Sequence, residues 1–310
     1  MAVLESEVEV SQQPDKAGAP DRIERKPADG ELVDVMGGAA RWEIRVHDHG
    51  LVALVDAMPR LVPAGQTADA AIVQAARVSY GAGTKKVNED RGLIRYLLRH
   101  HHTTPFEMVE FKFHCVMPIF VARQWIRHRT ANVNEYSARY SVVRDRFYRP
   151  AREDIKVQSK SNRQGREELA DDTTASAFLE HLQKVEAEQY EAYERFIEAG
   201  MARELARVAL PVNVYTEWYW KCDLHNILRF LQLRMDEHAQ KEIRDYATAM
   251  HELIRPIVPI TCEAFEDYLL GGMHLTRLEI EALRTGQPLA SDNKREVAEW
   301  EQKKRRLNRD

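Results

Sequence analysis

The spacing of hydrophobic residues changes repeatedly along this 310-residue chain, without a regular alternation of strand and helix patterns. From Val109 to Val116 every second residue is apolar, which predicts a half-buried strand. Between residues 88 and 100 the apolar residues recur at helical spacing instead. Such an irregular mixture predicts an α+β fold, with mixed helices and a small antiparallel sheet, rather than a doubly wound parallel sheet.

The same two spacings of apolar residues, every second residue or helical spacing, predict the other strands and helices. Strands are expected at 42–46, 51–55 and 212–222, and helices at 69–79, 119–129, 173–199, 224–234, 239–254 and 261–270. Residues 151–172 are polar and poor in hydrophobic side chains, which predicts a loop or insertion. We therefore expect one folded domain over residues 41–274.

Both ends of the chain have a different composition from this domain. Residues 1–40 carry nine acids and four bases with little periodicity, so we expect a mostly disordered extension, with order beginning near Trp42. Residues 275–310 form a charged C-terminal extension, which from Asp292 onward is expected to be a solvated helix or disordered.

Charge and cysteine content exclude several classes of protein. A net charge of -4 argues against a general binder of nucleic acid or membrane surfaces, and no apolar run is long enough to span a bilayer. Three cysteines without a CxxC pair predict neither a disulfide framework nor a zinc site, and they favour a cytoplasmic protein. The three consecutive histidines at 100–102 point in different directions on a helix end, so no metal site is predicted.

The segment from Arg123 to Arg149 stands out chemically. It holds seven arginines, no lysine and only two acids, which gives a local charge of +5 inside an acidic chain. Arginine binds phosphate through a planar, bidentate fork, and aromatic residues are interleaved with it here. This pattern indicates an anionic, planar ligand. A helix continuing to Arg129 would place Gln124, Arg127 and His128 on one face. A binder of single-stranded nucleic acid is the alternative, although the positive charge is confined to one segment.

The sequence of this segment resembles a known family. Arg127-His128-Arg129, seven further residues and then Ser137 match the RHR-x7-S signature of flavin-dependent thymidylate synthases, within the string RHRTANVNEYSARYS at 127–141. Asn132 stands where serine is commoner. The resemblance extends over about 42–272 and includes HTTPFE at 102–107, PIFVARQW at 118–125, RELARVALP at 203–211 and LRMDEHAQ at 233–240.

The resemblance implies an activity and its ligands. Members of this family methylate dUMP reductively to dTMP, with methylenetetrahydrofolate as the one-carbon donor, FAD as the hydride carrier and NADPH as the reductant. They are similar in being homotetramers whose active sites are shared between subunits. FAD is then held by arginines and backbone groups, consistent with the absence of a GxGxxG motif. A relative that methylates a different substrate remains an alternative.

The resemblance also implies residue roles. Arg234 matches the arginine that activates the uracil ring at N3, and it lies four residues before His238, so one helical face can present both side chains. Residues matched to FAD binding are His102, Thr104, Arg127, His128, Arg129, Glu135, Asp223, Leu224, His225, Arg229 and His238. Those matched to dUMP binding are Gln124, Trp125, Ile126, Arg127, Glu135, Tyr136, Ser137, Ala138, Arg139, Arg207 and Arg234. The family members differ among themselves around 223–229.

The implied chemistry needs no cysteine nucleophile. A buried guanidinium can stabilise negative charge on the uracil ring and so push electron density toward C5. None of Cys115, Cys222 and Cys262 lies in the Pro-Cys-His context of the cysteine-dependent synthases. Ser137 could act as a nucleophile only beside a base, which the sequence does not identify, so we expect it to bind phosphate.

Overall fold

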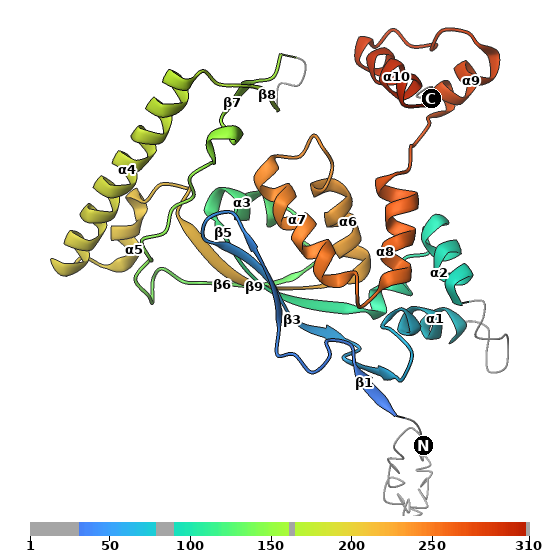
Figure 1. Cartoon of the computed structure of the whole chain (residues 1–310), viewed down its shortest axis with the longest axis horizontal. Helices are drawn as coiled ribbons and strands as arrows, with labels where there is room; N and C mark the ends of the chain where they lie inside the picture. Colours follow the sequence, from blue (N-terminus) through green and yellow to red (C-terminus); the bar gives the residue numbers. More distant parts are fainter. Residues whose placement is uncertain (1–30, 79–89, 161–164, 308–310) are drawn as a thin grey trace, which may run out of the picture. The chain divides into compact units, whose positions relative to one another are not determined.

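The computed structural model describes residues 31–78, 90–160 and 165–307 (Figure 1). The expected disorder of residues 1–30 therefore lies outside the described residues. A five-stranded antiparallel sheet forms the centre, in the order β2-β3-β5-β9-β6. Its strands are β2 (Trp42–Val46), β3 (Gly50–Met58), β5 (Glu110–Pro118), β9 (Tyr215–Asp223) and β6 (Asn132–Glu135). The α+β prediction is confirmed, and so are the strands expected near 42–46, 51–55, 109–116 and 212–222.

One face of this sheet carries the main core. The period-two residues Phe111, Phe113 and Cys115 are almost fully buried, as are Trp218 and Trp220 on the neighbouring strand. Helices α6 and α7 lie over this face (Figure 1). The helices that contribute to this core are α1 (Asp69–Val78), α2 (Asp90–Arg99), α3 (Ile119–Trp125), α6 (Leu224–Arg234), α7 (Lys241–Ile254) and α8 (Pro259–Phe265), the last continued by a π-helical turn at Glu266–Leu270.

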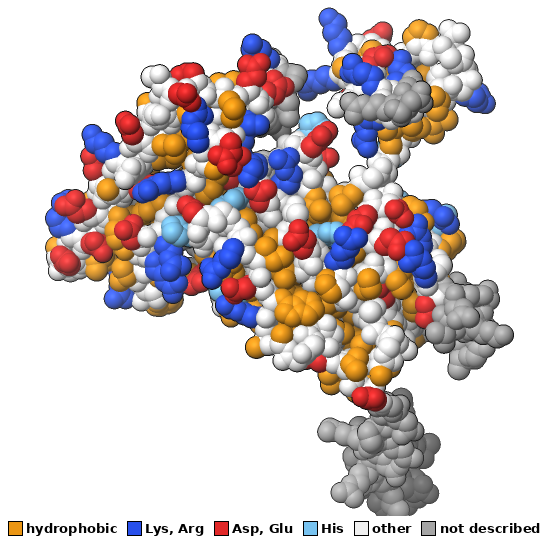
Figure 2. Space-filling model, viewed as in Figure 1, with side chains coloured by type: hydrophobic (Ala, Val, Ile, Leu, Met, Phe, Trp, Pro, Cys, Tyr) orange, Lys and Arg blue, Asp and Glu red, His pale blue; other side chains and the backbone are white. Residues whose placement is uncertain are grey.

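The predicted polar insertion contains a small hairpin, β7 (Lys156–Gln158) and β8 (Arg166–Leu169). It leads into the long predicted helix, α4 (Asp172–Glu198). Gly200 follows this helix with a φ of 84°, a left-handed conformation that glycine adopts without strain. The short helix α5 (Arg203–Ala206) and a 3-10 turn at Arg207–Ala209 lead back to β9. Acidic and basic side chains are mixed over α4 on the face drawn in Figure 2.

The N-terminal end of the described chain is ordered earlier than the sequence suggested, and the C-terminal tail takes the helical one of its two expected alternatives. Strand β1 (Leu32–Asp34) pairs with β4 (Leu61–Pro63), and Met36 is only 1% exposed, so order begins about ten residues before Trp42. The C-terminal extension forms α9 (Arg277–Thr285) and α10 (Lys294–Leu307). The buried Trp300 and an ion pair of 2.8 Å between Lys303 Nζ and Glu279 Oε1 give this pair of helices its own small core.

Candidate active site

Arg234, the last residue of α6, lies at the centre of the candidate site. Its Nε donates a hydrogen bond of 3.0 Å to Nε2 of His128, and its Nη2 lies 3.4 Å from the backbone oxygen of Gln124. Burial and the charge of Arg127 lower the pKa of Arg234. The guanidinium is therefore half-buried beside another cation and pairs with no carboxylate among the described residues.

His128 accepts the Arg234 hydrogen bond as a neutral imidazole. Burial, followed by the charges of Arg234 and Arg229, lowers the pKa of His128 from 6.5 to about 4. At neutral pH its Nε2 lone pair is therefore free to accept. The ring also packs edge-on against Phe230, with centroids 5.0 Å apart, which fixes its position.

Arg234 lines three of the described cavities, and two of these also include Arg127. The larger, of about 880 Å³, is lined by Gln124, Ile126, Arg127 and Glu135. The smaller, of about 300 Å³, is lined by residues of the RHR segment and of α6: Arg127, His128, Arg129, Thr130, Trp220, Cys222, Asn226, Arg229, Leu233 and Arg234. Because Arg127 and Arg234 line both, ligands in the two cavities would lie against the same pair of guanidinium groups.

These cavities concentrate positive charge, and Glu135 is the single acid in the linings of the two. Five arginines line them, and in the part of the chain that the structure describes none is within ion-pair distance of a carboxylate: Arg123, Arg127, Arg129, Arg229 and Arg234. Elsewhere arginines pair closely, as Arg149 does with Glu186 at 2.6 Å. Unpaired arginines grouped around a concave surface favour phosphate-bearing ligands.

The floor of the site is aromatic. Trp125 is fully buried, stacks on Phe230 at 4.8 Å and meets Trp218 edge-on at 5.6 Å. Its side chain therefore supports the site from below, and the predicted part of Trp125 in substrate binding stays a prediction. The helix placed Trp125 on its core-facing side, as it did Val121 and Ala122.

One helix end and two helical faces differ from the predictions. α3 ends at Trp125, and Arg127 and His128 follow in a turn, in which the His128 amide donates to the Trp125 carbonyl at 2.9 Å. α6 ends at Arg234, so His238 does not share a helical face with it. His238 is exposed and pairs with Asp236 at 2.9 Å in the loop that follows. Both predicted helical faces were wrong. α3 ends at Trp125 rather than at 129, and α6 ends at Arg234 as predicted, so no helical turn carries His238 onto the face of Arg234.

The residues at 223–229 that were matched to FAD binding occupy different kinds of position in the structure. Asp223 caps α6, since its carboxylate accepts from the Asn226 amide at 2.9 Å. The side chain of Leu224 is fully buried, and His225 lines no described cavity, so a contact of these two residues with FAD stays a prediction. Arg229 does line the smaller cavity, together with Asn226, which the sequence analysis missed. Their spacing of three along a helix could have indicated Asn226.

Other predicted residues lie apart from Arg234. Ser137, Arg139 and Arg207 line none of the described cavities that contain Arg234, and Arg139 pairs with Glu204 of α5 at 3.0 Å. Ala138 packs with the cluster beneath α4, and the Tyr136 hydroxyl donates to the Val142 carbonyl at 2.6 Å. His102 and Thr104 are exposed after α2 and likewise share no described cavity with Arg234.

The cysteines are placed as core residues. Cys115, Cys222 and Cys262 are all buried and free, and burial raises the pKa of each thiol. A buried thiol with a raised pKa is a poor nucleophile. Within the described ranges, no cluster of three or more metal-ligating side chains occurs, and no helix is long and apolar enough to cross a membrane.

The fold and the unpaired arginines define a class of protein: an α+β chain with adjoining sites for anionic ligands of the nucleotide type. Comparison with known proteins narrows this class. The model of the thymidylate synthase complementing protein family matches residues 60–260. The chain belongs to this family.

Individual relatives agree with that assignment. A flavin-dependent thymidylate synthase of Dictyostelium discoideum is 66% identical over 285 residues, which cover 92% of this chain and 94% of the relative. One from Gluconobacter oxydans is 52% identical, covering 80% of this chain and 81% of the relative. Among solved structures, a UMP/dUMP methylase from Streptomyces cacaoi bound with 5-Br dUMP aligns with a TM-score of 0.64 at 31% identity, over 73% of this chain and 98% of that one.

Proposed function

We infer that the chain is a flavin-dependent thymidylate synthase, which methylates dUMP reductively to dTMP with methylenetetrahydrofolate, FAD and NADPH. The observation that carries this conclusion is the position of Arg234, unpaired and held by His128 between two arginine-lined cavities. The family membership and the relatives above support the same activity.

In this proposal Arg234 activates the uracil ring. Arginine has five N–H donors, and only two of them are used here, by His128 and by the Gln124 carbonyl. The remaining donors are available to the O4–N3 edge of the base, where they stabilise negative charge and make C5 more nucleophilic. Neutral His128 fixes the guanidinium without competing as a cation. Gln124, Ile126, Arg127 and Glu135 complete the dUMP cavity.

The smaller cavity fits the phosphate-bearing part of FAD. Arg129 and Arg229 offer unpaired cations there, and Asn226 offers an amide. FAD, when bound, supplies the redox chemistry that takes hydride from NADPH to the one-carbon unit. The task of this chain's residues is to hold the phosphates and to keep Arg127 and Arg234 facing both ligands.

The remaining predicted residues fit a shared site. We propose that Ser137, Arg139 and Arg207 bind the dUMP phosphate, and that His102, Thr104 and His238 contact FAD, across subunits of a homotetramer. The separation of Ser137, Arg139, Arg207, His102 and Thr104 from the described cavities around Arg234 supports this arrangement. His238 lines a further cavity that also includes Arg234. Free cysteines support a location in a reducing cytoplasm.

The test is dTMP formation from dUMP, methylenetetrahydrofolate and NADPH by the purified, flavin-loaded protein. Bound flavin is read from its visible absorbance, which a nucleic-acid binder would lack. UMP is run in parallel, because the structural relative from Streptomyces cacaoi is a UMP/dUMP methylase. Methylation of UMP alone, or no flavin-dependent methylation of either nucleotide, would refute the proposed function.

A further inference from the structure

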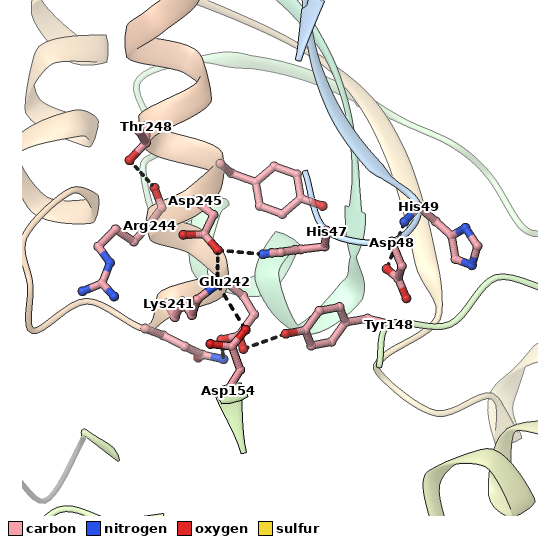
Figure 3. Close-up of polar contacts among 12 residues, drawn as sticks. His47, Asp48, His49, Tyr148, Asp154, Lys241, Glu242, Arg244, Asp245 and Thr248 are labelled. Carbon is pink, nitrogen blue, oxygen red and sulfur yellow. Dashed lines mark hydrogen bonds and ion pairs between the residues drawn. The ribbon is translucent and has the colours of Figure 1, made fainter. Parts of the chain in front are cut away.

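A second polar cluster lies at the start of α7, and its centre is Glu242 (Figure 3). This side chain is only 2% exposed and accepts three hydrogen bonds. The Tyr148 hydroxyl and Arg166 Nη2 each donate to Oε1 at 2.9 Å, and Gln240 Nε2 donates to Oε2 at 2.8 Å. Burial raises the pKa of Glu242, but the hydrogen bond from Gln240 and the Arg166 charge outweigh it, so the pKa lies below its usual value. Glu242 is therefore an ionised carboxylate that only accepts hydrogen bonds.

The carboxylate determines which way the Gln240 amide points. An amide has a donor end and an acceptor end, and only the NH2 end can face a carboxylate. The Oε1 end of Gln240 therefore points away from Glu242, and it accepts a hydrogen bond from Nε2 of Gln124. Gln124 lines the larger cavity beside Arg127 and Arg234. Its NH2 group gives one of its two N–H donors to Gln240, so the side-chain carbonyl oxygen of Gln124, at the other end of the amide, faces away from Gln240 and is the acceptor available to a ligand.

The polar insertion at 151–172 holds this relay in place, by which we mean the hydrogen bonds from Glu242 through Gln240 to Gln124. Arg166 comes from β8, and Asp154, at the start of the insertion, pairs with Lys241 at 3.3 Å. Lys241 also bonds Asp245 at 2.7 Å, and Asp245 bonds His47 at 3.0 Å (Figure 3). The insertion is thus fastened to the first turn of α7 at Lys241 and at Glu242 itself.

We propose that Glu242 is a positioning residue for the nucleotide site, which acts through Gln240 to turn the side-chain carbonyl of Gln124 toward the ligand. The group that meets this carbonyl oxygen is then a hydrogen-bond donor of the nucleotide, an N–H of the base or an O–H of the sugar. This inference rests on the proposed function, since it specifies which end of the Gln124 side chain meets the nucleotide in the proposed dUMP site.

A double-mutant cycle separates positioning from a purely structural role. The Kd of dUMP for the flavin-loaded enzyme is measured by calorimetry for wild type, Glu242→Gln, Gln124→Ala and the double variant. With Gln124 present, Glu242→Gln should weaken dUMP binding about tenfold, the value of one hydrogen bond. In the Gln124→Ala background the same change should alter the Kd by less than about twofold, because the group through which Glu242 acts is gone.

Glu186→Gln is the matched control, since Glu186 is equally buried and accepts from Arg149 and Asn213, but has no hydrogen bond to a residue of the larger cavity. It should leave the Kd of dUMP unchanged. Gln240→Met, at an exposed position, breaks the relay while leaving the Tyr148 and Arg166 bonds to Glu242, and should reproduce the tenfold loss even if Glu242→Gln does not fold.

Three results would overturn the inference: no loss of affinity in Gln240→Met, the same loss from Glu242→Gln in both backgrounds, or an equal loss in Glu186→Gln. Failure of the wild-type enzyme to bind dUMP would refute the proposed function, and this inference with it. Wild-type binding that Gln124→Ala weakens but Gln240→Met does not would refute only the relay.

Discussion

The neutral state of His128 makes the stability of this protein depend on pH in a defined direction. Its pKa is about 4 in the folded chain and 6.5 in its unperturbed state. The unfolded chain therefore binds more protons than the folded one between these values, and stability falls as the pH falls. The stability that the neutral His128 ring contributes is fully present above about pH 6.5, and it is lost progressively as the pH falls toward about pH 4.

The magnitude follows from the same two values. Between about pH 7.5 and about pH 5, the linkage relation gives a loss of about 2 kcal/mol, which partial solvent exposure of the ring reduces to about 1 kcal/mol. His128→Gln removes the titrating group but keeps an oxygen that can accept from Arg234. Its free energy of unfolding should therefore fall about 1 kcal/mol less than that of wild type over this range.

The assay is urea unfolding of the flavin-free protein, followed by tryptophan fluorescence at one fixed protein concentration across this pH range. His238→Gln serves as the control, because His238 is exposed on a loop, and its curve should follow that of wild type. Parallel pH profiles for wild type and His128→Gln would refute the argument, because they would show that His128 binds protons equally in both states.

Three further predictions concern other parts of the chain. Arg234→Ala should abolish dTMP formation while flavin absorbance is retained, because the variant loses the group that faces the base; near-normal turnover would contradict the assignment. Replacing Cys115, Cys222 and Cys262 together by alanine or valine should lower the free energy of unfolding by about a few kcal/mol but leave dTMP formation intact at a permissive temperature, since all three are buried. An inactive variant that keeps its fold and flavin would argue for a thiol mechanism. A chain that begins at residue 41 should have a free energy of unfolding about 2 kcal/mol or more below that of a chain that begins at residue 31, because only the shorter chain lacks β1 and the buried Met36. Equal urea midpoints for the two chains would show that β1 and Met36 contribute nothing to stability.

Much of the fold could be read from the order of apolar residues. Phe111, Phe113 and Cys115 alternate because β5 buries one face, and the apolar residues of α6 recur at helical spacing because one side of that helix packs on the sheet. These patterns involve only neighbouring residues, so they can be recognised in the sequence without knowledge of the tertiary structure. The arginine-rich segment was likewise visible, since its charge and residue types do not depend on folding.

Only the tertiary structure decided how these residues meet. The hydrogen bond from Arg234 to His128 joins positions 106 residues apart, and it depends on turns that end α3 and α6 before the predicted faces could form. The same holds for Trp125, which lies in the apolar period of its helix but belongs to the floor of the site. The hydrogen bonds from Glu242 through Gln240 to Gln124 could not be predicted from the spacing of apolar residues, because they are polar contacts between separate elements. Such contacts are set by three-dimensional packing, which brings together side chains that no local pattern relates.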